Sequence, residues 1–408
     1  MRQQATIMRF MRITTNYAHY LKQFYRERLA LARQPYATQY QALMEDGFGW
    51  ADFWTHALQP FGYEVWEPVA NAKPMQLAWA REHSVRYGRQ TWLTDILAAQ
   101  VKFFQPEILF AGDSTTFPPE FLRHLRQECP SIKLILGWCA PADIHKEYKA
   151  HDLIFSNVPA IVTHLRTRGH RAEYLKHAFE PRLLKGIIQT NMKKIPFSFI
   201  GSIFSESFHN ERELLVQMLL EKTPLEIWSN VYYFTRLHTK IIQRAIQLFC
   251  LLPGVETRLP RIPVICKYAI LQQPHLAFYA RQEIAPKIHQ WVFGQHMFQI
   301  LSQSIITLNH HGDHQWNAAC NMRMFEATGV GTCLLTDWKE NLPELFEPDR
   351  EVVTYRSLEE CQEKVNWLLT HPQQAAEIAR AGQARTLREH TFAHRAEQLH
   401  NIIHTALV

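Results

Sequence analysis

The sequence predicts an α/β protein made of two doubly wound domains with parallel sheets. Short apolar runs alternate with helical patterns through residues 9–175, the alternation stops over 177–196, and it then starts afresh. The chain has 408 residues, which is enough for two domains of ordinary size. We therefore expect a first domain over 1–185, a second over 196–390, and a last helix, 391–408, that packs back on the first domain.

In the first domain, each expected strand is a short apolar run that ends in a polar or glycine-containing turn. The first strand runs into Asn16, and the third ends at Gly112 and Asp113. Helical periods fill the intervals, and a loop rich in glycine and aromatic residues covers 46–56 and leads into a helix that ends near Leu58. The expected strands are 9–15, 63–66, 108–113, 133–138, 152–156 and 173–175, and the expected helices are 19–45, 74–104 (broken near residue 88), 118–127 and 158–168.

The second domain opens with a strand and a Gly201-Ser202 turn before a helix that begins at Glu211. A mostly helical, basic stretch separates its second strand from its third. The expected strands are 197–202, 225–230, 304–309, 332–335 and 351–355, and the expected later helices are 358–370, 373–388 and 391–406.

The most informative stretch is residues 323–337, which read as a short helix, a glycine break and a buried strand. Arg323 and Glu326 lie one turn apart on one helical face. Gly329 and Gly331 release the chain from the helix, because glycine takes left-handed angles at little cost. A ligand of such a domain is expected where the parallel strands end.

The composition is that of a globular protein, with 47% hydrophobic and 20% charged residues. No run approaches the ~18 apolar residues that span a bilayer, and we see no signal peptide. Seven cysteines are scattered without a C-x-x-C pair, which indicates free thiols in a reducing compartment. We expect a cytoplasmic protein.

A basic helical segment, 232–297, carries a net charge of +6, from eight Lys and Arg against two Glu. One interpretation is a solvated helical face. The other is a surface for anionic lipid headgroups at the inner membrane face, for an acidic acceptor or for nucleotide phosphates. Nucleic acid is not an expected partner, since the segment shows no recognised binding motif.

From about residue 294 to 390 the chain resembles GT-B glycosyltransferases, in particular the glycosyltransferase-1-like group with spore-maturation CgeB-type members. The motifs that carry the resemblance are FGQHM at 293–297, NMRMFEATGVG at 321–331, LLTD at 334–337, EVVTY at 351–355, AGQART at 381–386, and GS at 201–202 with His209 and Arg212. The resemblance implies two Rossmann-like domains facing across a cleft. It also implies metal-independent transfer of a sugar from a nucleotide-activated donor, with no cofactor besides that substrate.

The leaving nucleotide diphosphate develops negative charge, which without a metal must be met by cations and helix amides. Arg323 is the first candidate catalytic residue, with Arg212 and the amides of Gly201 and Ser202 as further donors. The alternative is a structural ion pair between Arg323 and Glu326.

Glu326 occupies the position where such folds use a carboxylate to accept both ribose hydroxyls. The other donor-binding residues that the resemblance implies are Asn321, Gly294, Met297, Asn309, Thr328 and Gly329. Backbone groups around 293–297 are expected to recognise the base, so the sequence identifies neither base nor sugar.

The chain departs from the family in one respect. Retaining members carry an earlier glutamate eight positions before the one matched by Glu326, and here that position is Ala318. Asp313 or Asn317 would have to contact the donor sugar, so the stereochemistry of this hexosyl or related transfer is undetermined. The histidines of 309–314 suggest a metal site, but adjacent residues of a loop point apart, and we expect no metal.

The first domain is expected to bind the acceptor, which the sequence leaves open as a glycan, a lipid, a protein or a small molecule. Asp113 and His56 are the candidate general bases. The alternatives are a helix cap for Asp113 and a packed helical residue for His56. Further strand-end candidates are Asn16, Asp52 and His177.

Two other functions remain open. A non-catalytic sugar-nucleotide-binding or scaffold protein would bind the donor without turnover. A nucleotide-sugar epimerase would convert the donor alone, without an acceptor.

Overall fold

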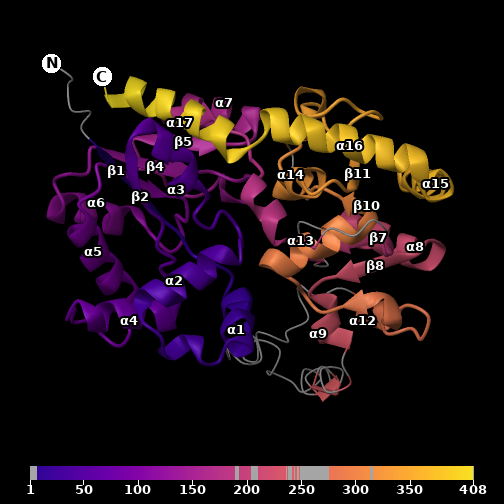
Figure 1. The fold of residues 1–408 in the computed structure, drawn as a ribbon, viewed down its shortest axis with the longest axis horizontal. Helices are drawn as coiled ribbons and strands as arrows, with labels where there is room; N and C mark the ends of the chain where they lie inside the picture. Colours follow the sequence, from indigo (N-terminus) through magenta and orange to yellow (C-terminus); the bar gives the residue numbers. More distant parts are fainter. Residues whose placement is uncertain are drawn as a thin grey trace. The chain divides into compact units, whose positions relative to one another are not determined.

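The computed structural model describes residues 7–188, 193–203, 210–235, 237, 241–242, 244–245, 248, 275–312 and 316–407. The chain forms two compact units, one of Met1–Leu183 with Glu389–Val408 and one of Leu184–Arg388 (Figure 1). His209, Asp313 and most of the predicted basic segment, including 249–274, lie outside the described residues.

Unit 1 is built on a six-stranded sheet in the order β2-β1-β3-β4-β5-β6, and all its pairs are parallel. Its central strands are buried on both faces, as in sheets that are covered by helices on both sides. The strands are β1 (Met8–Ile13), β2 (Tyr63–Trp66), β3 (Ile108–Ala111), β4 (Leu134–Trp138), β5 (Leu153–Ser156) and β6 (Ala172–Tyr174).

The helices of unit 1 follow the predicted intervals with one correction. The expected helix 19–45 is three pieces, since Pro35 precedes α2 and proline cannot continue a helix from the preceding turn. The helices are α1 (Ala18–Glu27), η1 (Leu31–Arg33), α2 (Tyr36–Glu45), α3 (Phe53–Leu58), η2 (Gln59–Phe61), α4 (Lys73–Glu82), α5 (Trp92–Phe104), α6 (Pro119–Glu128), η3 (Pro141–Asp143), α7 (Pro159–Thr167), η4 (Pro181–Gly186, which runs on into unit 2) and α17 (Phe392–Leu407).

Unit 2 has a second six-stranded parallel sheet, in the order β12-β11-β10-β7-β8-β9. The strands are β7 (Ile195–Ile200), β8 (Leu225–Trp228), β9 (Ile288–His289), β10 (Ser304–Asn309), β11 (Cys333–Asp337) and β12 (Val353–Tyr355). The described helices are α8 (Asn210–Lys222), α9 (Val231–Thr235), α12 (Leu276–Tyr279), η7 (Ala285–Lys287), α13 (Gly294–Gln303), α14 (Met322–Gly329), η8 (Leu342–Glu344), α15 (Leu358–Thr370) and α16 (Pro372–Glu389).

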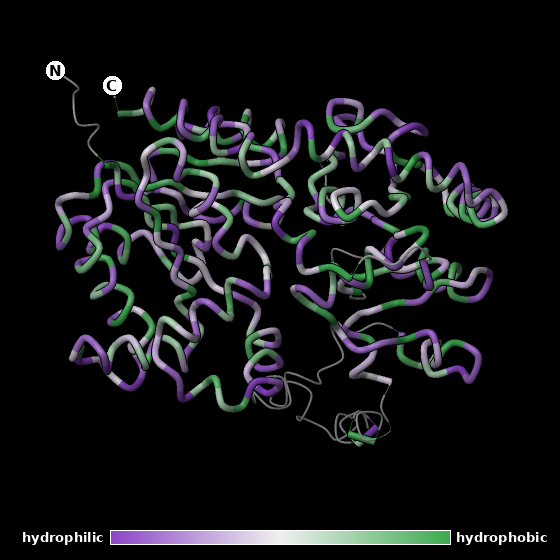
Figure 2. The backbone as a smooth tube through the Cα atoms, in the orientation of Figure 1, coloured by the Kyte–Doolittle hydropathy of each residue, from purple (hydrophilic) through white to green (hydrophobic). Residues whose placement is uncertain are grey.

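The core of unit 2 lies between this sheet and its helices. Phe197 and Ile306 are fully buried in one apolar cluster with Leu219 of α8 and Val365 of α15. Hydrophobic and hydrophilic residues alternate along α16 and α17, as expected of helices with one buried face (Figure 2). The predicted fold class, two doubly wound α/β domains with parallel sheets, is confirmed.

The last helix, α17, belongs to unit 1 and packs against α3. The chain returns through a parallel bridge between Phe179 and Thr391, in which the Phe179 N–H donates to His390 O at 2.8 Å. Within the described part of the chain, no helix has the length and apolar character needed to cross a membrane.

Candidate functional site

The carboxyl ends of four neighbouring strands of unit 2 carry the polar residues singled out by the sequence. β7, β10, β11 and β12 end at Ile200, Asn309, Asp337 and Tyr355, respectively. The strand order reverses between β7 and β10, because the chain leaves the sheet centre in both directions from this point. In doubly wound sheets the ligand crevice lies at such a reversal.

Arg212 joins the two strand ends at this reversal. It projects from α8, is 8% exposed, and donates from Nη1 to Ser202 O at 3.1 Å and from Nη2 to His310 O at 2.5 Å. The guanidinium therefore lies at the ends of both β7 and β10. It brings a positive charge to the edge where an anionic ligand of this sheet is expected.

Asn309 and Asn321 form a second link between elements of this edge. Asn309 Nδ2 donates to Thr336 Oγ1 at 2.9 Å, and Asn321 Nδ2 donates to Asn309 Oδ1 at 2.9 Å. Asn321 precedes α14 in an extended conformation, and its side chain does not cap that helix. Its amide instead holds the start of α14 against the end of β10.

Two histidines after β10 have different partners, and the sequence did not identify these contacts. His310 Nδ1 and the Tyr355 hydroxyl are 2.8 Å apart, and burial lowers the pKa of His310 to about 4. The next residue, His311, turns to Asp337, whose Oδ1 is 2.7 Å from His311 Nδ1 and accepts the His311 N–H at 3.0 Å. The Nδ1 atoms of these two adjacent rings therefore face different partners, Tyr355 and Asp337.

Asp337 is the centre of a buried charged group. Burial by itself would raise the pKa of this carboxyl, but His311, His310 and Lys339 hold it well below its usual range. Lys339 Nζ lies 3.1 Å from Asp337 Oδ2. The sequence indicated Asp337 through the Thr-Asp ending of the predicted strand. It did not indicate His311, which reaches Asp337 because β10 pairs with β11.

Arg323 and Glu326 are bound to each other. Arg323 Nη1 lies 2.8 Å from Glu326 Oε2, and their side chains are 17% and 12% exposed. The same Nη1 is 2.9 Å from Met297 Sδ, which comes from α13. The sequence explains this arrangement, because Met324, Phe325 and Ala327 turn the other face of α14 into the core. The ion pair that the sequence allowed as an alternative is thus present.

Three other predicted donor-site residues, Thr328, Gly329 and Gly294, lie at helix ends of unit 2. The Thr328 hydroxyl is buried between Met324 O, 2.7 Å away, and Thr386 Oγ1, 2.6 Å away, so its side chain ties α14 to α16. Gly329 is the last residue of α14, and the left-handed residue of the turn is Gly331, with φ of 78°. Gly294 begins α13, also with a positive φ of 53°.

In unit 1, Asp113 follows β3 and forms the cap of a turn. Its Oδ2 accepts from the hydroxyls of Thr15 and Thr116 at 2.6 Å each, and its Oδ1 accepts from the N–H of Thr115 and Thr116. Burial would raise the pKa of Asp113, but these hydrogen bonds lower it below its usual value. Such a carboxylate is a weak proton acceptor.

His56 has a different setting. Its side chain is 47% exposed, and its Nε2 lies 3.1 Å from Asp52 Oδ2. The other oxygen of Asp52 accepts from Arg182 Nη2 at 2.8 Å. Asp52 therefore holds the imidazole of His56 while the ring remains accessible. Asn16 is instead bonded through its backbone to the side chain of Asn71.

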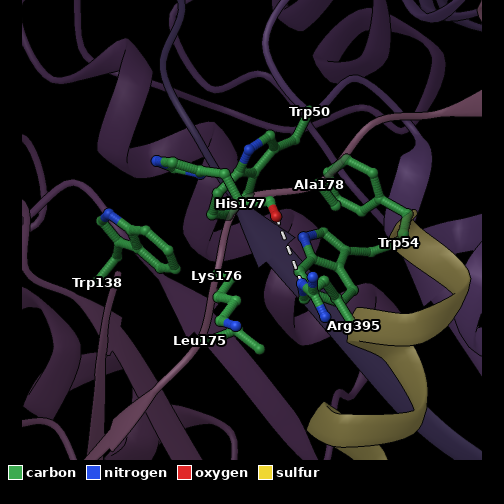
Figure 3. Close-up of a pocket in the computed structure, with 9 residues that line it drawn as sticks. Trp50, Trp54, Trp138, Leu175, Lys176, His177, Ala178 and Arg395 are labelled. Atoms are coloured by element: carbon green, nitrogen blue, oxygen red, sulfur yellow. Dashed lines mark hydrogen bonds between the residues drawn. The ribbon is translucent and has the colours of Figure 1, made fainter. Parts of the chain in front are cut away.

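A small, narrow cavity lies beside His177 in unit 1 (Figure 3). Trp50, Trp54, Trp138 and Arg395 are among its lining residues. Burial first, and Arg395 second, lower the pKa of His177 to about 3, so this ring is neutral at physiological pH. The sequence placed His177 at a strand end, but it did not identify the tryptophans or the arginine around it.

Both a protein-family model and solved structures resemble this chain. Residues 256–401 match a protein-family model described as glycosyl transferase-like. A search of curated proteins found no match.

Solved structures match over nearly the whole chain. A glycosyltransferase from Rickettsia africae superposes with a TM-score of 0.54 at 8% identity, covering 98% of this chain and 99% of its own. A sucrose-phosphate synthase from Thermosynechococcus elongatus gives 0.52 at 9% identity, with 98% of each chain covered. Anabaena HepE in complex with UDP and glucose gives 0.51 at 9% identity, covering 98% and 100%. At such identities the likeness concerns the fold, which is that of GT-B enzymes.

Proposed function

We propose that this protein is a glycosyltransferase that moves a sugar from a nucleotide-activated donor to an acceptor without a catalytic metal. The observation that carries the proposal is that the strand-end residues 309–337 of unit 2 fall inside the stretch that matches a glycosyl transferase-like family. The GT-B fold supports it. Membership of the CgeB-type subgroup is part of the proposal.

The donor diphosphate is assigned to the strand reversal between β7 and β10. Ser202 would bring a backbone amide there, whereas the Gly201 N–H donates to Trp228 O at 3.2 Å. Arg212 brings a cation that is already fixed by two carbonyl oxygens. Fixed donors need no reorganisation when charge develops on the leaving oxygen. When the bond between the anomeric carbon and this oxygen breaks, the electron pair leaves with the diphosphate, and Arg212 opposes the resulting charge.

The ribose is assigned to Glu326, which keeps Oε1 for hydroxyl groups while Oε2 accepts from Arg323. Arg323 then has two roles, orienting the carboxylate and adding positive charge near the leaving group. HepE is described in complex with UDP-glucose, and a uridine diphosphate sugar is therefore the first donor to test.

The acceptor is assigned to unit 1. Of the two candidate bases, His56 is better suited than Asp113, because Asp113 already accepts four hydrogen bonds. In an inverting transfer, His56 takes the proton of the acceptor hydroxyl as its oxygen bonds to the anomeric carbon, and Asp52 stabilises the imidazolium.

We also propose that the protein works in the cytoplasm and that the basic segment 232–297 touches an anionic inner membrane face. Three apolar side chains in this segment support the contact, since Leu237, Ile241 and Leu248 are 75%, 59% and 67% exposed. Exposed apolar side chains among basic residues are typical of helices that lie at a lipid surface.

A non-catalytic nucleotide-sugar-binding protein is the second candidate. The observation that favours it is Ala318, buried at 5% exposure where retaining relatives carry a glutamate. Such a protein would bind the donor and leave it intact. Measuring donor hydrolysis and transfer together with binding separates the two candidates.

The first experiment is thermal unfolding of the full chain with UDP, GDP, dTDP, ADP or CMP. A nucleotide at ~100 times its dissociation constant stabilises by about 2.7 kcal/mol. We expect a shift with one base, lost in Glu326→Ala and kept in Glu344→Ala, an exposed glutamate of η8. If none of the five nucleotides shifts the transition, the proposed donor site is wrong.

A further inference from the structure

Hydrogen-bond donors without acceptors gather around the cavity beside His177 (Figure 3). Trp50 and Trp54 line it, and in the part of the chain that the structure describes neither indole N–H has a partner. Trp54 is only 2% exposed, so water does not reach its N–H. An indole can only donate, and each unmet buried donor is costly. Two such groups at one cavity call for an acceptor.

Arg395 brings an uncompensated positive charge to the same cavity. It is 7% exposed and, among the described residues, forms no ion pair with a carboxylate. Its Nε donates to His177 O at 3.4 Å, the contact dashed in Figure 3, and its Nη2 donates to Glu389 O at 3.1 Å and lies 3.0 Å from His390 Nδ1. A buried guanidinium with only neutral partners is strongly disfavoured unless an anion is near.

The rest of the lining strengthens this charge pattern. Lys176 adds a second cation, and no residue of the lining carries a carboxylate. His177 is neutral, and its Nδ1 is also without a partner among the described residues. The side chains around the cavity therefore offer donors and positive charge, with His177 as the one side chain that can either donate or accept.

We propose that this cavity is a binding site for a small tetrahedral oxyanion such as phosphate or sulfate. Its oxygens would accept from the Trp50 and Trp54 indoles and from Arg395, whose planar fork suits oxyanions. The site is separate from the donor site of unit 2 and does not depend on sugar transfer.

The cavity is narrow in the observed conformation. The lining side chains lie so close together that a water molecule does not fit between them. Entry of the anion therefore requires a shift of the lining. The partly exposed residues of the lining are Trp50, Trp138, Lys176 and His177. The bound anion would join the Trp50 loop, the segment 175–178 and the first turn of α17.

The test is calorimetric unfolding of the full chain at constant ionic strength, with sodium phosphate or sodium sulfate replacing sodium chloride. We expect a saturable rise in Tm of the unit 1 transition, about 5 °C near 100 times the dissociation constant. Trp54→Phe keeps an aromatic ring but removes the indole N–H, and it should weaken anion binding at least tenfold. Arg395→Gln should weaken it more.

The control is Trp79→Phe, the same change at a tryptophan that is 3% exposed in another cluster of unit 1. It should keep the full response. The proposal is overturned if no saturable shift occurs, or if Trp54→Phe responds like the wild type. The second outcome would mean general salt stabilisation or phosphate binding at the donor site, both of which are indifferent to Trp54. Because Trp54→Phe is conservative, the test stands even where Arg395→Gln fails to fold.

Discussion

At the residue scale, one nitrogen of Arg323, Nη1, contacts both Glu326 and Met297. The i, i+3 spacing let the sequence predict that these two side chains meet, and their distance is 2.8 Å. The third partner, Met297 Sδ, lies 26 positions before Arg323 and comes from another helix. Local spacing carries no information about such a contact, so the sequence could propose Met297 only through a family resemblance.

Replacing Glu326 with Gln should weaken nucleotide binding about tenfold or more. The change removes a charged hydrogen-bond acceptor, which is worth about 1.5–3 kcal/mol, and leaves Arg323 without its ion-pair partner. Isothermal titration calorimetry with the nucleotide found by the unfolding panel measures the effect. Glu344→Gln is the matched control, and unchanged affinity in Glu326→Gln would remove this residue from the ribose site.

His310 should make stability depend on pH. Its folded pKa of about 4 is lower than the ordinary value of 6.5, so the unfolded chain binds the proton more readily. The contribution of neutral His310 to the free energy of unfolding is full above about pH 6.5, and it is lost as the pH falls toward 4. The difference of 6.5 − 4 = 2.5 pH units corresponds to on the order of 3 kcal/mol.

His310→Asn keeps a polar group near Tyr355 and removes this titration. The unit 2 transition of the variant, followed by calorimetry from pH 7.5 to pH 4, should therefore fall less steeply than that of the wild type. Equal slopes would mean that other groups carry the acid sensitivity of unit 2.

At the element scale, a three-residue turn, 330–332, connects α14 to β11, the strand that ends at Asp337. The sequence predicted helix, glycine break and strand in this order. It assigned left-handed angles to two glycines, whereas the structure uses Gly331 and keeps Gly329 in the helix. The reason is tertiary, because Gln383 of α16 donates to Gly329 O at 2.9 Å and holds the last turn of α14.

Gly331→Ala should destabilise unit 2 by about 1–2 kcal/mol. A left-handed φ of 78° costs this much for alanine, and the new Cβ would lie 3.2 Å from the Gln383 side chain. Gly169→Ala, at a φ of 82° with no atom within 4 Å of its Cβ, measures the backbone strain alone in unit 1. The crowding at Gly331 is then tested by repeating the change with Gln383→Ala. A cost for Gly331→Ala no larger than experimental error would contradict the assigned conformation.

At the scale of the whole molecule, the fold class was predictable and the site largely was not. Alternation of short apolar strands with amphipathic helices is a local signal, and it predicted both parallel sheets. The pair His311–Asp337 spans 26 positions and forms through the pairing of β10 with β11, and the Arg12–Glu67 ion pair joins residues on or beside two other strands. Such contacts depend on register, which residue spacing along one chain does not encode.

Removing residues 389–408 should destabilise unit 1 and spare unit 2. Phe392 packs its ring against Phe53 and Trp54, with centroids 5.0 and 5.3 Å apart, so the deletion exposes large aromatic surfaces. Calorimetry of the truncated chain should show the unit 1 transition moved down by several degrees and the unit 2 transition retained. Phe392→Ala is the milder variant, and an unchanged pair of transitions would show that α17 adds little to unit 1.

The return of the chain into unit 1 also sets an order for events during synthesis. The ribosome completes residues 1–183 early, yet the helix that covers Phe53 and Trp54 emerges only after all of unit 2. Unit 2 is contiguous in sequence and can close while α17 is still being made. Until α17 has emerged, the nascent first unit therefore keeps the aromatic surface of Phe53 and Trp54 uncovered.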